Sequence, residues 1–203
     1  MTTAPSAERP LRKDAAENRR RVLSAARELL GRHGLDVSMD AIAAEAGVGT
    51  GTLYRRFPSK EALVDALVAD IAESVRDAAE RALARGDGTG LEAFLREVAA
   101  SCASWRGFLA RLWDAHRSPA QSAEVRALVD RLLAQARQHG RVGPGVELRD
   151  VLLLLWALRG VIETTEDEAP GSWERHLELH LVGLRVGLPP GEHRSGGAVG
   201  AAG

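Results

Sequence analysis

Cysteine is nearly absent from this chain of 203 residues, which contains Cys102 alone. A single cysteine excludes an intramolecular disulfide and a cysteine-based zinc site, and it is typical of a reducing compartment. Residues 1–10 lack the apolar segment of a signal peptide, and the longest apolar run, 151–158, is too short to span a bilayer. We therefore expect a cytoplasmic protein without a membrane partner.

Aromatic residues are also scarce, at 4% of the chain, and valine and isoleucine are few beside alanine, leucine, arginine and glutamate. The abundant types are good helix formers and poor strand formers. Hydrophobic residues make up 45% and charged residues 27%, which excludes a chain that stays disordered for lack of apolar side chains. We expect a soluble all-α protein rather than a sandwich or barrel.

The formal net charge of −1 conceals an asymmetry along the chain. Residues 1–60 hold 11 Lys and Arg against 7 Asp and Glu, a net charge of +4, whereas residues 61–203 hold 16 against 21, a net charge of −5. A basic block on an acidic remainder suggests an anionic partner for the first block only, with nucleic acid as the leading candidate. A chance distribution of charge is the alternative.

Apolar residues recur at helical spacing along most of the chain, with no convincing strand and no internal repeat. About nine helices are expected, at 12–34, 38–47, 50–57, 59–85, 91–105, 108–116, 125–136, 146–163 and 172–187. The resulting organisation is a flexible lead (1–11), a three-helix domain (12–58), a larger helical domain (59–188) and a disordered glycine-rich tail (189–203).

Two short expected helices joined by residues 46–49 match the spacing of a helix-turn-helix. Gly47 can adopt the left-handed backbone that the tight turn needs. If Leu53 points inward, the helical rotation per residue turns Gly51 and Arg55 outward, with Thr52 and Tyr54 on the flanks. Such a helix fits the major groove, where an arginine can bind guanine and threonines can bind phosphates or a thymine methyl group.

The stretch 38–63, SMDAIAAEAGVGTGTLYRRFPSKEAL, resembles the TetR family of bacterial transcriptional regulators, and the likeness is dense over about 19–67. The resemblance implies a homodimer whose second domain binds a ligand and dimerises. Gly49 departs from the family's frequent hydroxyl cap, and Arg56 stands where histidine is usual. The expected DNA-binding residues are Ser38, Thr50, Gly51, Thr52, Tyr54, Arg55, Arg56 and Lys60.

Two basic features can be interpreted either as DNA contacts or as ordinary solvated surface charge. Lys60, one of only two lysines, lies in the first turn of an expected helix, where a bound phosphate would relieve the conflict between its cation and the helix dipole; a solvated surface lysine is the alternative. The basic segment 9–21 is either a solvated helix face or an arm that contacts the DNA backbone or minor groove.

Other motifs carry little chemistry. The glycines of 47–52 follow no strand and precede no Gly-Lys-Ser/Thr, so a nucleotide loop is not expected. His176 and His180 lie four residues apart without further ligands, and packed histidines are the better interpretation than a metal site. No catalytic constellation appears at a recognisable spacing, and we expect no enzyme activity, cofactor or metal.

Several aromatic and polar residues of the middle region allow either core packing or a ligand pocket. With the family resemblance we expect a small-molecule pocket among Ile71, Cys102, Trp105, Phe108, Trp113, His116, Trp156 and Arg159.

The first of the last two expected helices is apolar almost all round, and few residues follow the second to cover its stripe, which predicts a two-fold four-helix bundle with a second subunit, as the family resemblance also implies. Burial of both helices within one subunit is the alternative. The expected interface residues are Leu152, Leu155, Trp173, Leu177, His180, Leu181 and Leu184.

Together with the family resemblance, these features predict a one-component transcriptional regulator, expected to be a repressor, that binds a palindromic double-stranded operator as a homodimer and is released by a small-molecule effector. The helix over 59–85 would carry the signal between the domains. The alternatives are a DNA-binding regulator without a ligand and a helical carrier or enzyme with an incidental motif.

Overall fold

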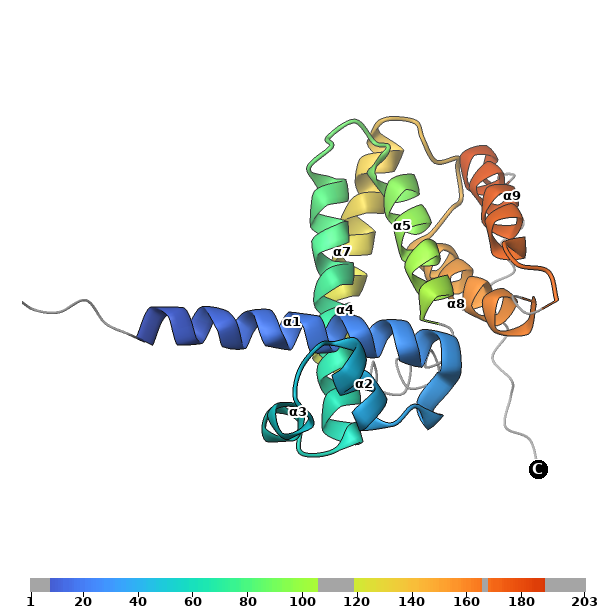
Figure 1. The fold of residues 1–203 in the computed structure, drawn as a ribbon. Helices are drawn as coiled ribbons and strands as arrows, with labels where there is room; N and C mark the ends of the chain where they lie inside the picture. The colour runs from blue at the N-terminus through green and yellow to red at the C-terminus, as the bar shows by residue number, and fades with distance from the viewer. Residues whose placement is uncertain (1–7, 106–118, 166–167, 189–203) are drawn as a thin grey trace, which may run out of the picture.

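A computed structural model describes residues 8–105, 119–165 and 168–188. These residues form eight α-helices and one short 3₁₀-helix and contain no strand, which confirms the expected all-α class (Figure 1). The elements are α1 (Glu8–His33), η1 (Gly34–Asp36), α2 (Met39–Glu45), α3 (Thr50–Arg56), α4 (Lys60–Leu83), α5 (Gly90–Ser104), α7 (Pro119–Gln138), α8 (Leu148–Thr165) and α9 (Ser172–Val186). No helix among the described residues is long and apolar enough to cross a membrane.

Two helices begin earlier than the sequence suggested. Helix α1 starts at Glu8, so residues 8–11 are helical and not part of a flexible lead; Pro10 is tolerated in the first turn, where backbone N–H groups lack helical partners. Helix α7 starts at Pro119, because proline is well suited to the first position of a helix. The expected helix 108–116, the lead 1–7 and the tail 189–203 lie outside the described residues.

Helix α4 connects two hydrophobic cores. Ser59 caps it, accepting a hydrogen bond from the backbone N–H of Ala62 at 3.2 Å. Its first half buries Leu63, Leu67 and Ile71 against α1, α2 and α3 in a first core. Its second half packs Ala78, Ala79 and Ala82 into a second core with α5, α7, α8 and α9.

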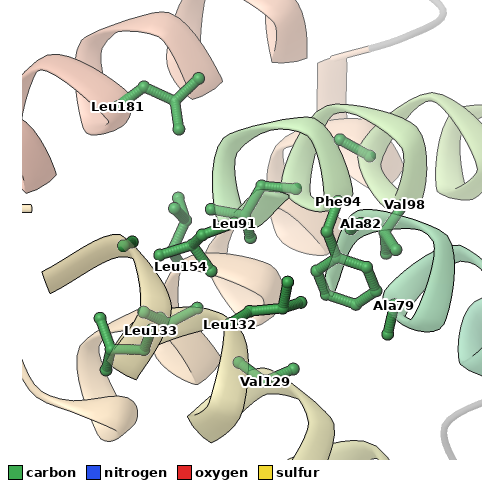
Figure 2. Close-up of a cluster of buried hydrophobic side chains, with 14 of the residues drawn as sticks. Ala79, Ala82, Leu91, Phe94, Val98, Val129, Leu132, Leu133, Leu154 and Leu181 are labelled. Atoms are coloured by element: carbon green, nitrogen blue, oxygen red, sulfur yellow. The ribbon is translucent and has the colours of Figure 1, made fainter. Parts of the chain in front are cut away.

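The second core is built from leucines and one phenylalanine that converge from different helices (Figure 2). Phe94 of α5, Leu132 of α7, Leu154 of α8 and Leu181 of α9 are among its buried side chains. Figure 1 shows α4, α5 and α7 running alongside one another, with α1 crossing them and α2 and α3 on the far side of α1. The short helices therefore lie at one end of the molecule and the second core at the other.

The first core also receives side chains from the larger domain. Trp105, at the end of α5, and Ile162 of α8 are buried in it. The guanidinium of Arg27 on α1 lies 5.8 Å from the centre of the Trp105 ring and donates a 2.7 Å hydrogen bond to Asp70 of α4. Helices α1, α2 and α3 are thus packed against α4, α5 and α8 together.

A close backbone approach fixes α1 against the end of α5. A Cβ atom added to Gly31 would lie 2.3 Å from the carbonyl oxygen of Ser104. Because the obstructing atom belongs to the backbone, no side-chain rotation can relieve the overlap. Any residue larger than glycine at position 31 must push the two helices apart.

Gly31→Ala should therefore destabilise the protein by ~1–3 kcal/mol, despite the better helix propensity of alanine. Gly51→Ala is the matched control, since a Cβ there would meet nothing within 4 Å. Urea denaturation of the two variants and the wild type measures the difference. Equal stability of Gly31→Ala and the wild type would contradict the observed packing.

Candidate nucleic-acid interface

The turn between α2 and α3 is held by backbone hydrogen bonds and one left-handed glycine. Gly47 has a φ of 61°, and the N–H of Val48 donates to the carbonyl of Ala43 at 3.0 Å. Gly49 begins α3 without a side-chain cap, which agrees with the hydroxyl that the sequence lacks at this position. The geometry is a helix, a tight turn and a second helix, as the spacing predicted.

Helix α3 has one buried and one exposed face. Leu53 and the capping residue Phe57 are buried in the first core and orient the helix. Six residues of α3 are expected to contact DNA. Thr52 is half-buried, and the other five are exposed, namely Thr50, Gly51, Tyr54, Arg55 and Arg56. Arg55 donates a 3.0 Å hydrogen bond to the Thr52 hydroxyl, so the two lie together on this face.

Ser38 and Lys60 flank α3 and already have structural partners. The Ser38 hydroxyl caps α2 by accepting a hydrogen bond from the N–H of Ala41 at 3.1 Å. The ammonium group of Lys60 donates to the carbonyl of Leu35 in η1. This hydrogen bond joins the start of α4 to η1, a role that the sequence did not indicate. An ammonium group has three donors, so a further acceptor is compatible with this contact.

The basic residues of α1 have partners of their own. Arg20 pairs with Glu17, and Arg21 donates to Asn18 at 2.5 Å. Arg21 also lies near the turn, because a Cβ atom at Gly47 would be 3.6 Å from its guanidinium. These contacts support a helix face with solvated charge, while Arg21 is the member of the basic segment that lies beside the helix-turn-helix.

The residues expected in a ligand pocket are dispersed. Ile71 and Trp105 are buried in the first core, and Cys102 is half-buried between the two cores. Burial raises the pKa of the Cys102 thiol to about 11, so it is uncharged at neutral pH. Arg159 binds Glu163 on its own helix at 2.8 Å. Three further members of the expected set lie outside the described residues, namely Phe108, Trp113 and His116.

Trp156 lies apart from the buried members of this set, with its side chain 63% exposed on α8. Trp105, in contrast, lines a cavity of about 150 Å³ between α4 and α5. Val75 and Ala78 of α4 and Val98 of α5 form its apolar part, and Asp77, Arg81 and Glu97 form its polar edge. A small molecule near Trp105 would therefore contact the same ring that packs on Arg27.

Two residues of the expected dimer interface are buried within their own chain. Leu177 and Leu181 are 2% and 3% exposed, because they pack into the second core of their own chain, and Leu184 packs partly against it. Leu152, Leu155 and Trp173 are half-buried, whereas His180 is exposed. The side chains that remain open are Leu153 at 58%, Leu179 at 58%, Val182 at 52% and Val186 at 72%.

Helix α9 carries a second apolar stripe, which the expected dimer interface did not include. Leu179, Val182 and Val186 are spaced by three and four residues and lie opposite the buried stripe of α9. This spacing was a usable signal. Because both stripes are apolar, periodicity alone did not reveal which stripe enters the core of the same chain.

His176 and His180 stack with ring centres 4.2 Å apart. Burial, and then the neighbouring His180, lower the pKa of His176, so its imidazole is neutral near pH 7. Within the part of the chain that the structure describes, no group of three or more His, Cys, Asp or Glu could hold a metal ion. The pair therefore stands as two neighbouring histidines on the surface of α9.

Two family profiles match the chain. The profile of bacterial regulatory proteins of the tetR family matches residues 22–67, and that of the C-terminal domain of SbtR-like transcriptional regulators matches residues 86–186. An HTH-type transcriptional regulator of Staphylococcus aureus is 48% identical over 54 residues, which make up 26% of this chain and 29% of that protein. The chain thus spans less than a third of the curated relative it matches.

Solved structures extend the likeness over both domains. A TetR transcription regulatory protein from Mycobacterium vanbaalenii is 36% identical, with 87% of this chain and 100% of that one covered and a TM-score of 0.69. A TetR transcriptional regulator from Streptomyces coelicolor is 28% identical, with 83% and 98% covered and a TM-score of 0.67. RolR in complex with resorcinol is 22% identical, with 84% and 88% covered and a TM-score of 0.51, and shares the fold.

The turn geometry generates a prediction with an internal control. Gly47→Ala should destabilise the protein by ~1–2 kcal/mol, because alanine is strained at positive φ while its Cβ would have only an ordinary contact. Gly49→Ala should cost less, ~0.5 kcal/mol, since Gly49 has a φ of −67° and alanine is only a poorer N-cap residue than glycine. Thermal denaturation compares them, and a Gly49→Ala variant as unstable as Gly47→Ala would contradict the assigned turn.

Proposed function

Because the chain belongs to the TetR family of bacterial transcriptional regulators, we propose that it is a repressor that binds a palindromic operator as a homodimer and leaves it when a small molecule binds. The family consists of regulators and not of enzymes, in agreement with the expectation of no catalytic role. A protein that acts on chromosomal DNA in bacteria works in the cytoplasm, and we assign it there.

The observation that carries the proposal is the outward face of α3. Buried Leu53 and Phe57 orient this helix, and no bulky side chain stands at Gly51 to keep the backbone from base edges. Arg55 supplies a planar fork for guanine, while Thr50 and Thr52 supply hydroxyl groups. Ser38, Tyr54, Arg56 and Lys60 surround this face and are suited to phosphates.

The open apolar face of α8 and α9 supports a homodimer. Leu153, Leu179, Val182 and Val186 are each more than half exposed, and water-exposed leucine and valine on adjoining helices favour burial against another chain. A second copy presents the same face, so a two-fold axis would bury all of them at once in a four-helix bundle. We propose this face in place of the interface expected from the sequence, because Leu177 and Leu181 of that interface are buried in their own chain.

The dimer sets the geometry of repression. Two recognition helices must be about 34–36 Å apart, or a multiple of this, to enter successive major grooves on one side of the DNA. A change in the tilt of each head relative to the bundle alters this separation. A ligand that favours the altered state then lowers operator affinity, since binding shifts the population toward the state it prefers.

A route for such a signal runs through Trp105 as well as α4. The Trp105 ring lines the small cavity between α4 and α5 on one side and contacts Arg27 of α1 on the other. Arg27 in turn holds Asp70 of α4. RolR, which shares the fold, holds resorcinol, so a small ring compound is an effector size that this architecture accommodates.

Substitutions on α3 test the DNA interface. Arg55→Ala should cost ~1–3 kcal/mol in operator affinity and relax sequence preference, because it removes a base contact. Lys60→Ala should weaken binding to all sequences alike and reduce the salt slope by about one. Fluorescence anisotropy on duplexes selected by the wild-type protein from random DNA measures both effects.

Arg131→Ala, an exposed arginine of α7, is the matched control and should bind as the wild type does. An Arg55→Ala variant with unchanged affinity and unchanged preference would show that α3 is not the recognition helix.

The dimer surface has its own test. Leu179→Glu combined with Val182→Glu should raise the dimer dissociation constant about 100-fold or more while the helical circular dichroism persists, because both side chains lie outside the core. Analytical ultracentrifugation and operator binding are the measurements. Ala134→Glu, on the exposed face of α7, should stay dimeric.

Leu181→Glu should instead unfold the chain, since it places a charge in the second core. If the Leu179/Val182 variant sediments as the wild type does, the dimer does not use this face.

A further inference from the structure

A second and larger cavity lies far from the helix-turn-helix, between α5 and α9 at the end of the molecule where α5 begins (Figure 1). Its volume is about 920 Å³. The loop before α5 and the loop after α7 complete its walls. The N–H of Gly143 donates to the carbonyl of Leu184, and the N–H of Leu188 donates to the carbonyl of Pro144, both at 2.8 Å, so the second loop is fixed to α9 by its backbone.

The floor of this cavity is apolar. Leu91 and Leu95 of α5 and Leu181 of α9 form it, and all three belong to the second core. Ala93 of α5 is a half-buried part of the wall. Val142 and Leu184 line the cavity as well and are also half-buried, so a ligand seated here would cover apolar atoms of Ala93, Val142 and Leu184, which favours a hydrocarbon portion in the ligand.

The rim of the cavity is basic. Four arginines line it, Arg85, Arg96, Arg141 and Arg185, against two glutamates, Glu92 and Glu97. This excess of positive charge stands in a region, residues 61–203, whose net charge is −5. Because the rim is basic although the region as a whole is acidic, the local charge favours an anionic ligand.

Both glutamates of the rim are already neutralised. Glu92 accepts hydrogen bonds from Arg96 at 2.8 Å and from Arg185 at 2.6 Å. Burial raises the pKa of Glu92, but these two hydrogen bonds outweigh it and hold the pKa below the usual value, so the carboxylate stays charged. Glu97 pairs with Arg81 at 2.7 Å. These pairs also tie α5 to α9 and α4, which preforms the cavity.

Arg85 and Arg141 differ from the other two arginines. Among the described residues, neither side chain donates a hydrogen bond or forms an ion pair, although the charge of Arg141 acts on nearby Asp87. Asp87 itself accepts hydrogen bonds from the backbone N–H and hydroxyl of Thr89 at 2.9 and 2.6 Å. Two of the arginines that line the cavity are therefore not hydrogen-bonded to a carboxylate of the described residues.

We propose that this cavity binds a small amphipathic anion, with its hydrocarbon part on Ala93, Val142 and Leu184 and its carboxylate or phosphate group at Arg85 and Arg141. A guanidinium forms paired hydrogen bonds with either kind of head group. The volume lies in the range of small-molecule sites, about 300–1,000 Å³. This site is separate from the cavity beside Trp105, and it does not depend on operator binding.

Isothermal titration calorimetry of the full-length protein without DNA tests the proposal, with decanoate, decyl phosphate and uncharged decanol as probes. The two anions should bind the wild type, and decanol should bind about ten-fold more weakly or not at all. The double variant Arg85→Gln with Arg141→Gln should weaken both anions about ten-fold or more. The double variant Arg126→Gln with Arg131→Gln, which makes the same change of charge on the exposed face of α7, should leave affinity unchanged.

Ala93→Trp places an indole in the wall of the cavity without removing a core side chain, and it should abolish binding of both anions. The proposal is overturned if neither anion binds the wild type at concentrations up to about 1 mM. It is also overturned if decanol binds as tightly as decanoate, or if the arginine double variant and Ala93→Trp bind the anions as the wild type does. Decyl phosphate binding without decanoate binding, or the reverse, identifies the head group and supports the site.

Discussion

Burial of the first half of α4 in the same core as α1, α2 and α3 is the constraint on which the arrangement of this protein depends. Helices α1, α2 and α3 by themselves bury too little apolar surface to hold α3 in one orientation. Leu63, Leu67 and Ile71 supply part of the missing surface, and Trp105 and Ile162 supply more from the larger domain. The orientation of α3 therefore depends in part on residues of α4, α8 and the end of α5.

The larger domain is stiffened by apolar packing and by a chain of charges. Its leucine-rich core joins five helices, and Glu92 links α5 to α9 through Arg185. Arg96, on the same helix as Glu92, also pairs with Glu178 of α9. These pairs are at the surface and each contributes little to stability, yet together they fix how the two helices face each other. One face of α9 therefore packs against its own chain, and the opposite face is exposed to solvent.

The sequence was sufficient for the fold class, the helix-turn-helix and the outward face of α3, because each depends on local spacing. Leu53 sets the phase of a seven-residue helix, and the positions of Arg55 and Gly51 follow. It was not sufficient for α9, where Leu181 and Val182 are equally apolar neighbours and only tertiary packing separates core from surface. The exposure of Trp156 was not predictable for the same reason, since an aromatic residue on an apolar helix can face either the interior or the solvent. The contacts of Arg27 with Asp70 and Trp105 join residues distant in the sequence, and no local pattern reveals them.

Hydrogen exchange of the wild type and of a Trp105→Leu variant tests most directly whether the DNA-binding helices and the end of α5 form one cooperative unit. Removing the indole leaves space in the first core and takes away the ring that contacts Arg27. The account predicts that amides of α1, α2 and α3 lose protection by about ten-fold or more, together with those at the end of α5. Faster exchange confined to the end of α5, with α1 to α3 unchanged, would contradict it.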